Sequence, residues 1–281
     1  MKILVTGASG FIGNYVLNYL VTNTEHEIIA TSRNRDKVNN SNWLPKVEFV
    51  EADLYSTSTN LFDLFKNPDI LIHLAWSNLP NYTKSFHLTD NLPNEIQFLE
   101  RMINDGIRKI VVTGSCFEYG IQEGELNENL PTYPNNPYAI AKDSLRRYLE
   151  FKSSQNFFHL LWLRLFYTFG EGQSKNSLIP QLEKSLKTGQ LSFNMTGGEQ
   201  IRDYLPIEEV AELIVKSSLN NDLHGIVNIS SGKPVRLKDF IIKYLESKEN
   251  RLTLNLGYYP YSSLEPMAFW GNNNKLKTKI T

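Results

Sequence analysis

The sequence predicts an α/β protein built on a doubly wound parallel sheet, with a smaller C-terminal α/β lobe. The chain opens with a short apolar run that gives way to spaced glycines and then to a helical pattern. Strand-like runs and helical patterns then alternate, which is typical of parallel sheets with right-handed crossovers. One of these runs, 70–75, is apolar almost throughout, as strands covered on both faces are.

The composition is that of an ordinary globular protein. The 281 residues are 41% hydrophobic and 21% charged with a net charge of -1, so nothing favours nucleic acid or an anionic membrane as a partner. The single cysteine, Cys116, excludes a disulfide framework and a multi-cysteine metal site, and we expect no metal. Without a signal peptide or a long apolar run, we expect a cytoplasmic protein with no membrane span.

The first strand and turn predict a dinucleotide site. A strand at Ile3–Val5 is followed by Gly7, Gly10 and Gly13 and by a helix that runs through Leu20. In such a turn the first glycine permits the tight bend, the second lets the backbone approach a pyrophosphate, and the third lets the helix pack on its strand. The helix N-terminus then offers free N–H groups to the phosphates.

The second strand, 26–31, predicts which cofactor binds. An acidic residue at the end of this strand accepts a hydrogen bond from the ribose 2′-hydroxyl, whereas arginine accommodates a 2′-phosphate. Ser32, Arg33, Asn34 and Arg35 follow the strand, and no acidic residue comes before Asp36. This favours NADP(H) over NAD(H), although Asp36 leaves NAD(H) open.

The next strands predict the rest of the cofactor site. Run 47–52 is a third strand, and Asp53 and Leu54 follow it where a loop could lie along the adenine. The fourth strand contains His73, which we interpret as a packed histidine without a chemical role. A helix at 91–103 and a fifth strand at 109–113 bring segment 114–120 to the carboxyl edge of the sheet, where ligands collect.

The helix that follows a proline-rich stretch at 131–137 carries the predicted acid–base pair. Tyr138 and Lys142 are four residues apart on the helix 138–150 and share one face. An ammonium there should lower the phenol pKa from about 10, so Tyr138 becomes a general acid or base. Ser115 is placed to donate a hydrogen bond to a substrate carbonyl.

The second half of the chain is less regular. After a sixth strand at 159–166 we predict helices at 177–186, 207–219 and 237–245 and strands at 191–195 and 227–230. No clear pattern follows Arg251, and we expect the lysine-rich end from Lys275 to be frayed. We predict a Rossmann cofactor domain at 1–172, with later crossings near 201–230, and a mainly substrate-binding lobe at 173–281.

Together these motifs resemble the extended short-chain dehydrogenase/reductases, in the nucleotide-sugar branch of the NAD-dependent epimerase/dehydratase family. The likeness covers roughly residues 1–245 and implies a nucleoside-diphosphate sugar held between the lobes. It implies that Asn91 organises the proton relay and that 177–180 and Arg202 bind the diphosphate, a task that suits the arginine fork. Tyr167 stands where the family normally has an asparagine. A homodimer through the helices near Asn91 and Tyr138 is also implied.

The predicted site residues fall into three groups. The catalytic residues are Ser115, Tyr138 and Lys142. The cofactor-binding residues are Gly7, Ser9, Gly10, Phe11, Ile12, Gly13, Ser32, Arg33, Asn34, Asp53, Leu54, Leu74, Ala75, Asn91, Tyr138 and Lys142. The substrate-binding residues are Ser115, Cys116, Phe117, Tyr167, Ser177, Leu178, Ile179 and Arg202.

The residues after Ser115 narrow the reaction. The 4,6-dehydratases of this family carry an Asp-Glu pair there, but this chain has Cys116 and Phe117, and phenylalanine has no proton to give. Glu118 comes one position later and is as readily turned away from the site as catalytic. Cys116 has no neighbouring histidine to activate it, and we interpret it as a packed residue.

The remaining reactions are 4-epimerisation and 4-keto reduction. An epimerase retains its cofactor, which suits NAD, whereas a reductase exchanges its cofactor, which suits NADPH and Arg33. Segment 114–120 is similar to that of reductases that make deoxysugars of bacterial surface polysaccharides such as O-antigen. We therefore favour reduction of C4 in a nucleoside-diphosphate 4-keto-6-deoxy sugar, with a 4-epimerase as the alternative. A non-catalytic dinucleotide sensor is a remote alternative, and Tyr138 and Lys142 argue against it.

Overall fold

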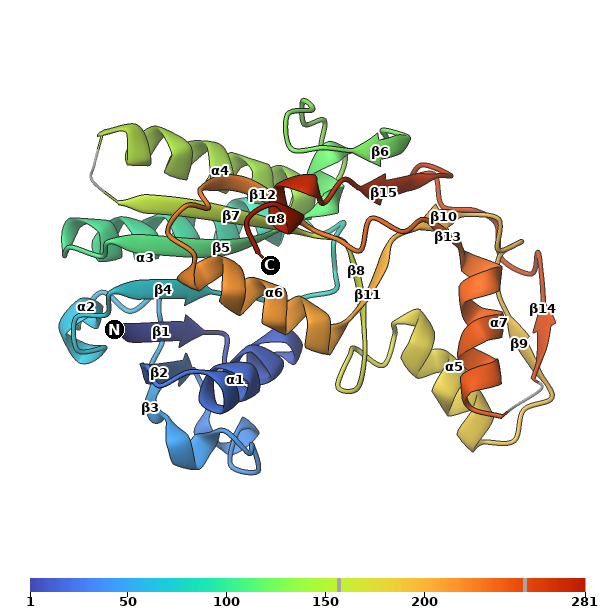
Figure 1. Ribbon diagram of the computed structural model, residues 1–281, viewed down its shortest axis with the longest axis horizontal. Coiled ribbons are helices and arrows are strands. Elements are labelled where there is room, and N and C mark those ends of the chain that lie inside the picture. Colours follow the sequence, from blue (N-terminus) through green and yellow to red (C-terminus); the bar gives the residue numbers. More distant parts are fainter. Residues whose placement is uncertain (156–157, 250–251, 281) are drawn as a thin grey trace.

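The structure is a computed structural model that describes residues 1–155, 158–249 and 252–280 (Figure 1). Arg251, after which the sequence shows no clear pattern, lies outside these residues. Seven parallel strands form one sheet. In sheet order they are β12 (Gly225–Ile229), β7 (His159–Leu165), β5 (Lys109–Ser115), β4 (Ile70–His73), β1 (Lys2–Thr6), β2 (Glu27–Ser32) and β3 (Glu48–Glu51). The order reverses between β1 and β4, so the predicted doubly wound fold is confirmed.

Helices cover both faces of this sheet, because its strands alternate apolar side chains between the two faces. Ile3 and Val5 belong to one core with α1 (Phe11–Asn23) and α6 (Ile207–Leu219), which lie together in front of the sheet in Figure 1. Leu4 belongs to the core on the opposite face of the sheet, where a second set of helices packs. Those helices are α2 (Leu61–Leu64), α3 (Leu92–Asn104) and α4 (Pro137–Gln155).

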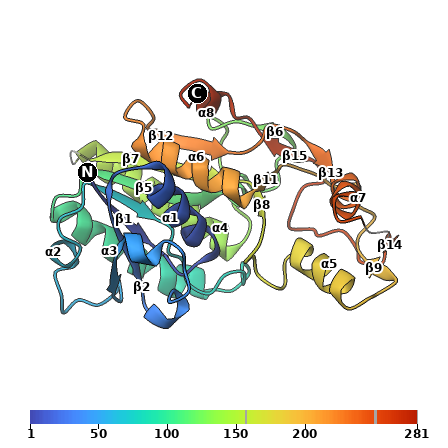
Figure 2. The ribbon, with the colours of Figure 1, turned by 60° about the horizontal axis from the view of Figure 1, so that its bottom comes forward.

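A smaller lobe has its own core. Helices α5 (Leu178–Lys187) and α7 (Leu237–Ser247) pack with the paired strands β9 (Ser192–Asn194) and β14 (Thr253–Asn255). The core residues are Ile179, Leu182, Phe193, Met195, Ile241, Leu245 and Leu252. Figures 1 and 2 both show this lobe beside the carboxyl end of the sheet, away from α3.

Short strand pairs connect the two parts. They are β8 (Tyr167–Phe169) with β11 (Tyr204–Pro206), β10 (Ile201–Arg202) with β13 (Val235–Arg236), and β6 (Gly124–Leu126) with β15 (Phe269–Gly271). The chain thus crosses between the lobes several times, and α6 and β12 return to the main sheet. We propose residue 172 as the domain boundary. It distinguishes two hydrophobic cores and does not divide the chain into two separate segments.

The lysine-rich end is docked, so the prediction that it is frayed is wrong for the described residues. Helix α8 (Asn274–Lys277) buries Leu276 in the core that contains α6. Lys275 Nζ donates to the carbonyls of His224 (2.9 Å) and Ile226 (2.6 Å), beside the edge strand β12. An edge strand has unpaired carbonyls, and the lysine satisfies them here.

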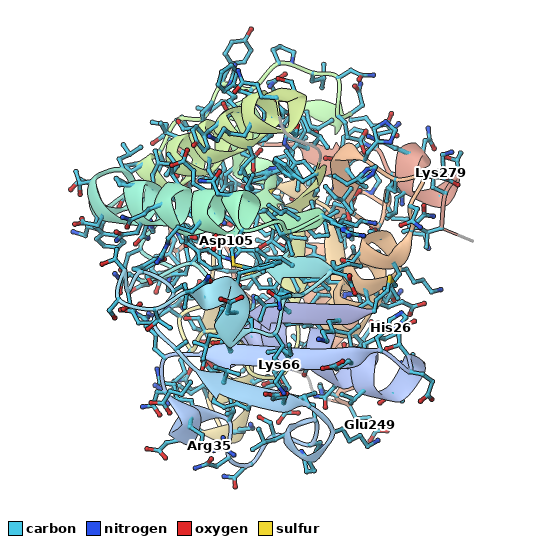
Figure 3. All side chains as sticks on the ribbon, turned by 90° about the vertical axis from the view of Figure 1, so that its left-hand side faces the viewer. His26, Arg35, Lys66, Asp105, Glu249 and Lys279 are labelled. Atoms are coloured by element: carbon cyan, nitrogen blue, oxygen red, sulfur yellow. The ribbon has the colours of Figure 1, made fainter. Side chains whose placement is uncertain are left out.

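The two edges of the sheet differ in what they carry. Figure 3 looks onto the amino edge, where the labelled His26, Lys66 and Asp105 lie in the turns that lead into β2, β4 and β5. The carboxyl edge lies on the opposite side and faces the smaller lobe. No helix within the described ranges is both long and apolar enough to cross a membrane.

Candidate active site

A cavity opens at the carboxyl ends of β1 to β4, beside the point where the strand order reverses. Predicted cofactor residues form most of its wall: Gly7, Ser9, Gly10, Ser32, Arg33, Asp53, Leu54, Leu74 and Ala75. Five further residues were not predicted from the sequence: Thr31, Ala52, Tyr55, Trp76 and Ser77. A crevice at this place in a doubly wound sheet is where nucleotides bind.

The glycine turn fits a dinucleotide pyrophosphate. Gly7 has φ of +72°, and a Cβ there would lie 2.8 Å from the Ala75 nitrogen. A Cβ on Gly13 would lie 2.2 Å from the Gly7 carbonyl oxygen, so only glycine lets α1 pack this closely. Gly10 is the N-cap of α1 and provides no side-chain cap. The first-turn N–H groups, including those of Phe11 and Ile12, are therefore available to phosphate oxygens.

Seven predicted cofactor residues do not line this cavity: Phe11, Ile12, Gly13, Asn34, Asn91, Tyr138 and Lys142. The Asn34 side chain accepts from the Asp36 N–H (2.7 Å) and caps its own turn. Arg35 turns its guanidinium over the Phe49 ring, which leaves Arg33 as the arginine in the cavity wall. Asn91 closes a π-helical turn, His87–Asn91, and its amide donates to the Ser77 carbonyl (3.0 Å). Asn91 thus contacts the cavity wall through Ser77 and does not line the cavity itself.

A buried polar chain connects the strands to Tyr55 in the cavity wall. Thr6 Oγ1 and His73 Nδ1 are 2.8 Å apart, and His73 Nε2 lies 2.7 Å from Glu95 Oε2. The Tyr55 hydroxyl donates to the other Glu95 oxygen (2.8 Å). Burial, reinforced by the Glu95 charge, raises the pKa of Tyr55. The interpretation of His73 as a packed histidine is consistent with this geometry.

Tyr138 and Lys142 are both buried on α4, whose start is capped by the Asn136 side chain on the Ala139 N–H (3.0 Å). Lys142 Nζ donates to the Thr113 carbonyl (2.9 Å) and lies 3.9 Å from the centre of the Trp76 ring. Burial lowers the pKa of Lys142 to about 8. Indole rings attract cations, so Trp76 helps to hold the ammonium.

The lowered pKa predicted for Tyr138 is not found in this structure. Burial raises the pKa of Tyr138 well above 10, and the nearby Tyr82, Glu118 and Cys116 raise it further. Desolvation disfavours the phenolate more than one ammonium compensates. Tyr138 is therefore held in its protonated form.

Ser115 begins a tight 3₁₀ turn, Cys116–Tyr119, at the end of β5. Its hydroxyl oxygen accepts from the Phe117 N–H (3.2 Å), so the hydroxyl proton remains free to be donated. Glu118 accepts from the Ser115 N–H (2.8 Å) and from Arg164 Nε (2.8 Å), and it is fully buried. Of the two interpretations of Glu118, the structure supports the one in which it is turned away from the site.

Aromatic rings connect Tyr138 to the substrate side. Tyr82 lies 5.2 Å from the Tyr138 ring and 5.5 Å from the Phe117 ring, and Phe117 lies 6.4 Å from Tyr167. The Tyr138 N–H also donates to the Tyr82 carbonyl (3.1 Å). Tyr82 stands in a loop without a motif, and the sequence analysis missed it. These rings bring together Tyr138, Phe117 and Tyr167, which are far apart in the sequence.

The sequence matches a known family over most of its length. Residues 3–230 fit the NAD dependent epimerase/dehydratase family. The chain belongs to this family. Its members are enzymes of the short-chain dehydrogenase/reductase type, and so is this chain.

The relatives of this chain are named for different reactions. A protein of Aggregatibacter actinomycetemcomitans named dTDP-6-deoxy-L-talose 4-dehydrogenase (NAD(+)) is 32% identical, over 96% of this chain and 99% of its own. A putative UDP-glucose 4-epimerase of Methanocaldococcus jannaschii is 30% identical over 86% of this chain and 81% of its own. The fold resembles that of UDP-N-acetylglucosamine 4-epimerase from Methanobrevibacter ruminantium M1, with a TM-score of 0.87 and 22% identity over 100% of this chain and 91% of that one.

Among the predicted substrate residues, Arg202 is paired within the protein. Its NH2 atom lies 3.1 Å from Glu265 Oε2, and its NH1 atom donates to the carbonyls of Ile201 (2.8 Å) and Met267 (3.1 Å). Tyr167 donates from its hydroxyl to the same Glu265 oxygen. Glu265 lies in a loop without a motif, so no signal in the sequence marked it.

The other predicted substrate residues are spread over two regions. Cys116 is 6% exposed, and burial, reinforced by the Glu265 charge, raises the pKa of its thiol. Ser177 is the N-cap of α5 and Leu178 its first residue, while Ile179 packs into the core of the small lobe. Cys116 therefore lies with the Tyr138 cluster, and the α5 residues lie on the opposite lobe.

Proposed function

We propose that this enzyme reduces the C4 keto group of a nucleoside-diphosphate 4-keto-6-deoxy sugar. The observation that carries the proposal is the arrangement after Ser115. Phe117 adds only an apolar ring, Cys116 is a buried thiol, and the carboxylate of this turn, Glu118, is bound to Arg164. Dehydration needs a second acid–base pair at the sugar, and this turn does not supply one.

The proposed proton donor is Tyr138. A tyrosine phenol is protonated at neutral pH, as the donor to a forming alkoxide must be, and burial raises the pKa of Tyr138 further. Ser115 holds the same oxygen with its free hydroxyl proton, and Lys142, one helical turn from Tyr138, stabilises the phenolate that remains. When bound, the reduced nicotinamide supplies the hydride for C4.

Relatives lend support at a coarser level. The relative from Aggregatibacter actinomycetemcomitans is named as a 4-dehydrogenase of a dTDP-6-deoxy sugar, which supports redox chemistry at C4 of a nucleotide sugar. We propose NADP(H) as the preferred cofactor, because Arg33 lines the cavity and no acidic residue ends β2. That relative is named for NAD(+), so both cofactors belong in the assay. We also propose a cytoplasmic homodimer.

The deciding experiment follows the absorbance of NADPH and NADH with a panel of 4-keto-6-deoxy sugar nucleotides that differ in base and sugar. We expect loss of reduced cofactor in a one-to-one ratio with the 4-hydroxy product, with a lower KM for NADPH. A Lys277→Ala variant, at an exposed position outside the predicted site residues, serves as the control and should retain the reaction. Cofactor that remains unchanged with every sugar would contradict the proposal.

The second candidate is a nucleotide-sugar 4-epimerase, which two of the similar proteins are named as. It predicts interconversion of two 4-epimeric sugars with catalytic NAD and no net consumption of cofactor. Product analysis after incubation of each sugar with NAD distinguishes the two reactions.

A further inference from the structure

A carboxylate from late in the sequence reaches the substrate side of the site. Both contacts of Glu265 use Oε2, which accepts from the Tyr167 hydroxyl and from Arg202. Among the described residues, none donates a hydrogen bond to Oε1, and 28% of the side chain is exposed. One oxygen is therefore available to a ligand, while the other is held by neighbours that are themselves mostly buried.

Glu265 lies near residues that surround Tyr138, because its charge reaches Tyr82. The ring series from Tyr138 through Tyr82 and Phe117 ends at Tyr167, which binds Glu265. The charge of Glu265 also reaches the Cys116 thiol in the turn after Ser115. The carboxylate thus adjoins the wall of side chains that Tyr82, Phe117 and Tyr167 form beside Tyr138.

This wall has two chemically different sides. Tyr82 and Phe117 present aromatic rings, whereas Glu265 and Tyr167 present a carboxylate and a hydroxyl. A 6-deoxy sugar has the same division, with a methyl group on one part of the ring and hydroxyls on another. Hydrogen bonds from hydroxyls to a carboxylate are short and strong, and Arg202 neutralises the charge that would otherwise repel a diphosphate.

We propose that Glu265 is the hydroxyl-binding residue of the sugar subsite. It accepts a hydrogen bond on Oε1 from the C2 or C3 hydroxyl, while the C6 methyl packs against Tyr82 and Phe117. This inference rests on the proposed function, since it takes a 6-deoxy sugar as the ligand. A site built around a hydroxyl rejects the analogue that lacks it, because its buried polar group is then left unpaired.

The test measures binding without turnover. Calorimetry compares the bare nucleoside diphosphate, its 6-deoxyhexose conjugate, and the 2-deoxy and 3-deoxy analogues of that conjugate, with the base that the enzyme accepts. We expect wild type to bind one deoxy analogue roughly 30-fold more weakly than the parent, and Glu265→Gln to reduce this ratio to about threefold or less. Affinity for the bare diphosphate should not fall, because Gln removes a negative charge beside Arg202.

The matched control is Glu123→Gln. Glu123 is exposed and accepts from the Met267 N–H (3.3 Å), so it contacts the same loop from outside. Glu123→Gln should leave the ratio of affinities for the parent conjugate and its deoxy analogue at the wild-type value. If Glu265→Gln weakens the binding of the bare diphosphate and of all conjugates by the same factor, Glu265 only stabilises the loop. That result would overturn the proposal.

Other outcomes separate this inference from the proposed function. Equal binding of the parent and both deoxy analogues by wild type overturns the role of Glu265 even if 4-keto sugars are reduced. Discrimination that depends on Glu265, without reduction of any 4-keto sugar, supports the subsite and overturns the proposed reaction. Failure to bind any nucleotide sugar overturns both.

Discussion

At the scale of single residues, burial raises the pKa of Tyr138, which is protonated at neutral pH. Tyr138→Phe removes the phenolic proton and little volume, so we expect kcat for 4-keto reduction to fall by about 10³-fold. Steady-state kinetics measure this, and fluorescence titration of NADPH should give an unchanged Kd within about twofold. A variant that keeps the biological activity in full would instead favour a dinucleotide sensor.

Lys142 carries a cost in stability. The ordinary pKa of a lysine is 10.5, whereas the pKa of Lys142 in the folded protein is about 8. Between these two pH values the unfolded chain therefore binds more protons than the folded protein. The free energy of unfolding therefore increases as pH rises from about 8 to 10.5, and the full penalty is present below pH 8. Lys142→Met should stabilise the protein at pH 7 by on the order of 3 kcal/mol, and this gain should vanish above pH 10.5.

Urea unfolding at pH 7 and pH 10.5 measures this difference. Lys216→Met is the control, because Lys216 is exposed and pairs with Glu212 (2.8 Å) one turn away. Such a surface pair contributes little, so that variant should change stability by under about 1 kcal/mol at both values. Identical midpoints for Lys142→Met and wild type at pH 7 would contradict the prediction.

At the scale of elements, the 3₁₀ turn after β5 depends on Glu118. Its carboxylate caps the turn, accepts from the Trp162 indole (3.0 Å) and pairs with the buried Arg164. Glu118→Ala leaves a buried guanidinium unpaired and should cost about 3–5 kcal/mol of unfolding free energy. Thermal unfolding measures the loss. Glu125→Ala, at the exposed position of β6, should cost under about 1 kcal/mol. If Glu118 were instead catalytic, the Glu118→Ala variant would lose enzyme activity and keep its stability.

Elements with their own periodicity could be predicted from the sequence. Helix α6 begins at Ile207 and ends at Leu219, as its apolar spacing indicated. The three-residue strands β6, β14 and β15 were missed, because their pairing depends on partners far away and so short a segment shows no alternation. The same limit applies to the site. The glycine turn is local and was predictable, whereas Tyr82 and Glu265 reach the site only through the folding of unpatterned loops.

At the scale of the whole molecule, α8 fastens the end of the chain to the main core. Leu276 is 3% exposed in the cluster that holds Ile214 and Val227. Leu276→Ala should reduce the free energy of unfolding by about 2–4 kcal/mol, because it leaves a cavity beside β12. Chemical denaturation measures this. The neighbouring exposed Lys277→Ala should have little effect, and equal losses in both variants would contradict the packing role of α8.

The pairing of β6 with β15 bears on how the enzyme is made. A ribosome completes the dinucleotide turn and the Tyr138 helix long before it reaches Glu265 and β15. A nascent chain therefore contains the residues of its nucleotide pocket first, and the residues of the proposed sugar side are complete only with the final segment. Premature termination shortly before Glu265 would leave a polypeptide with the parts to hold cofactor and without those to select a sugar.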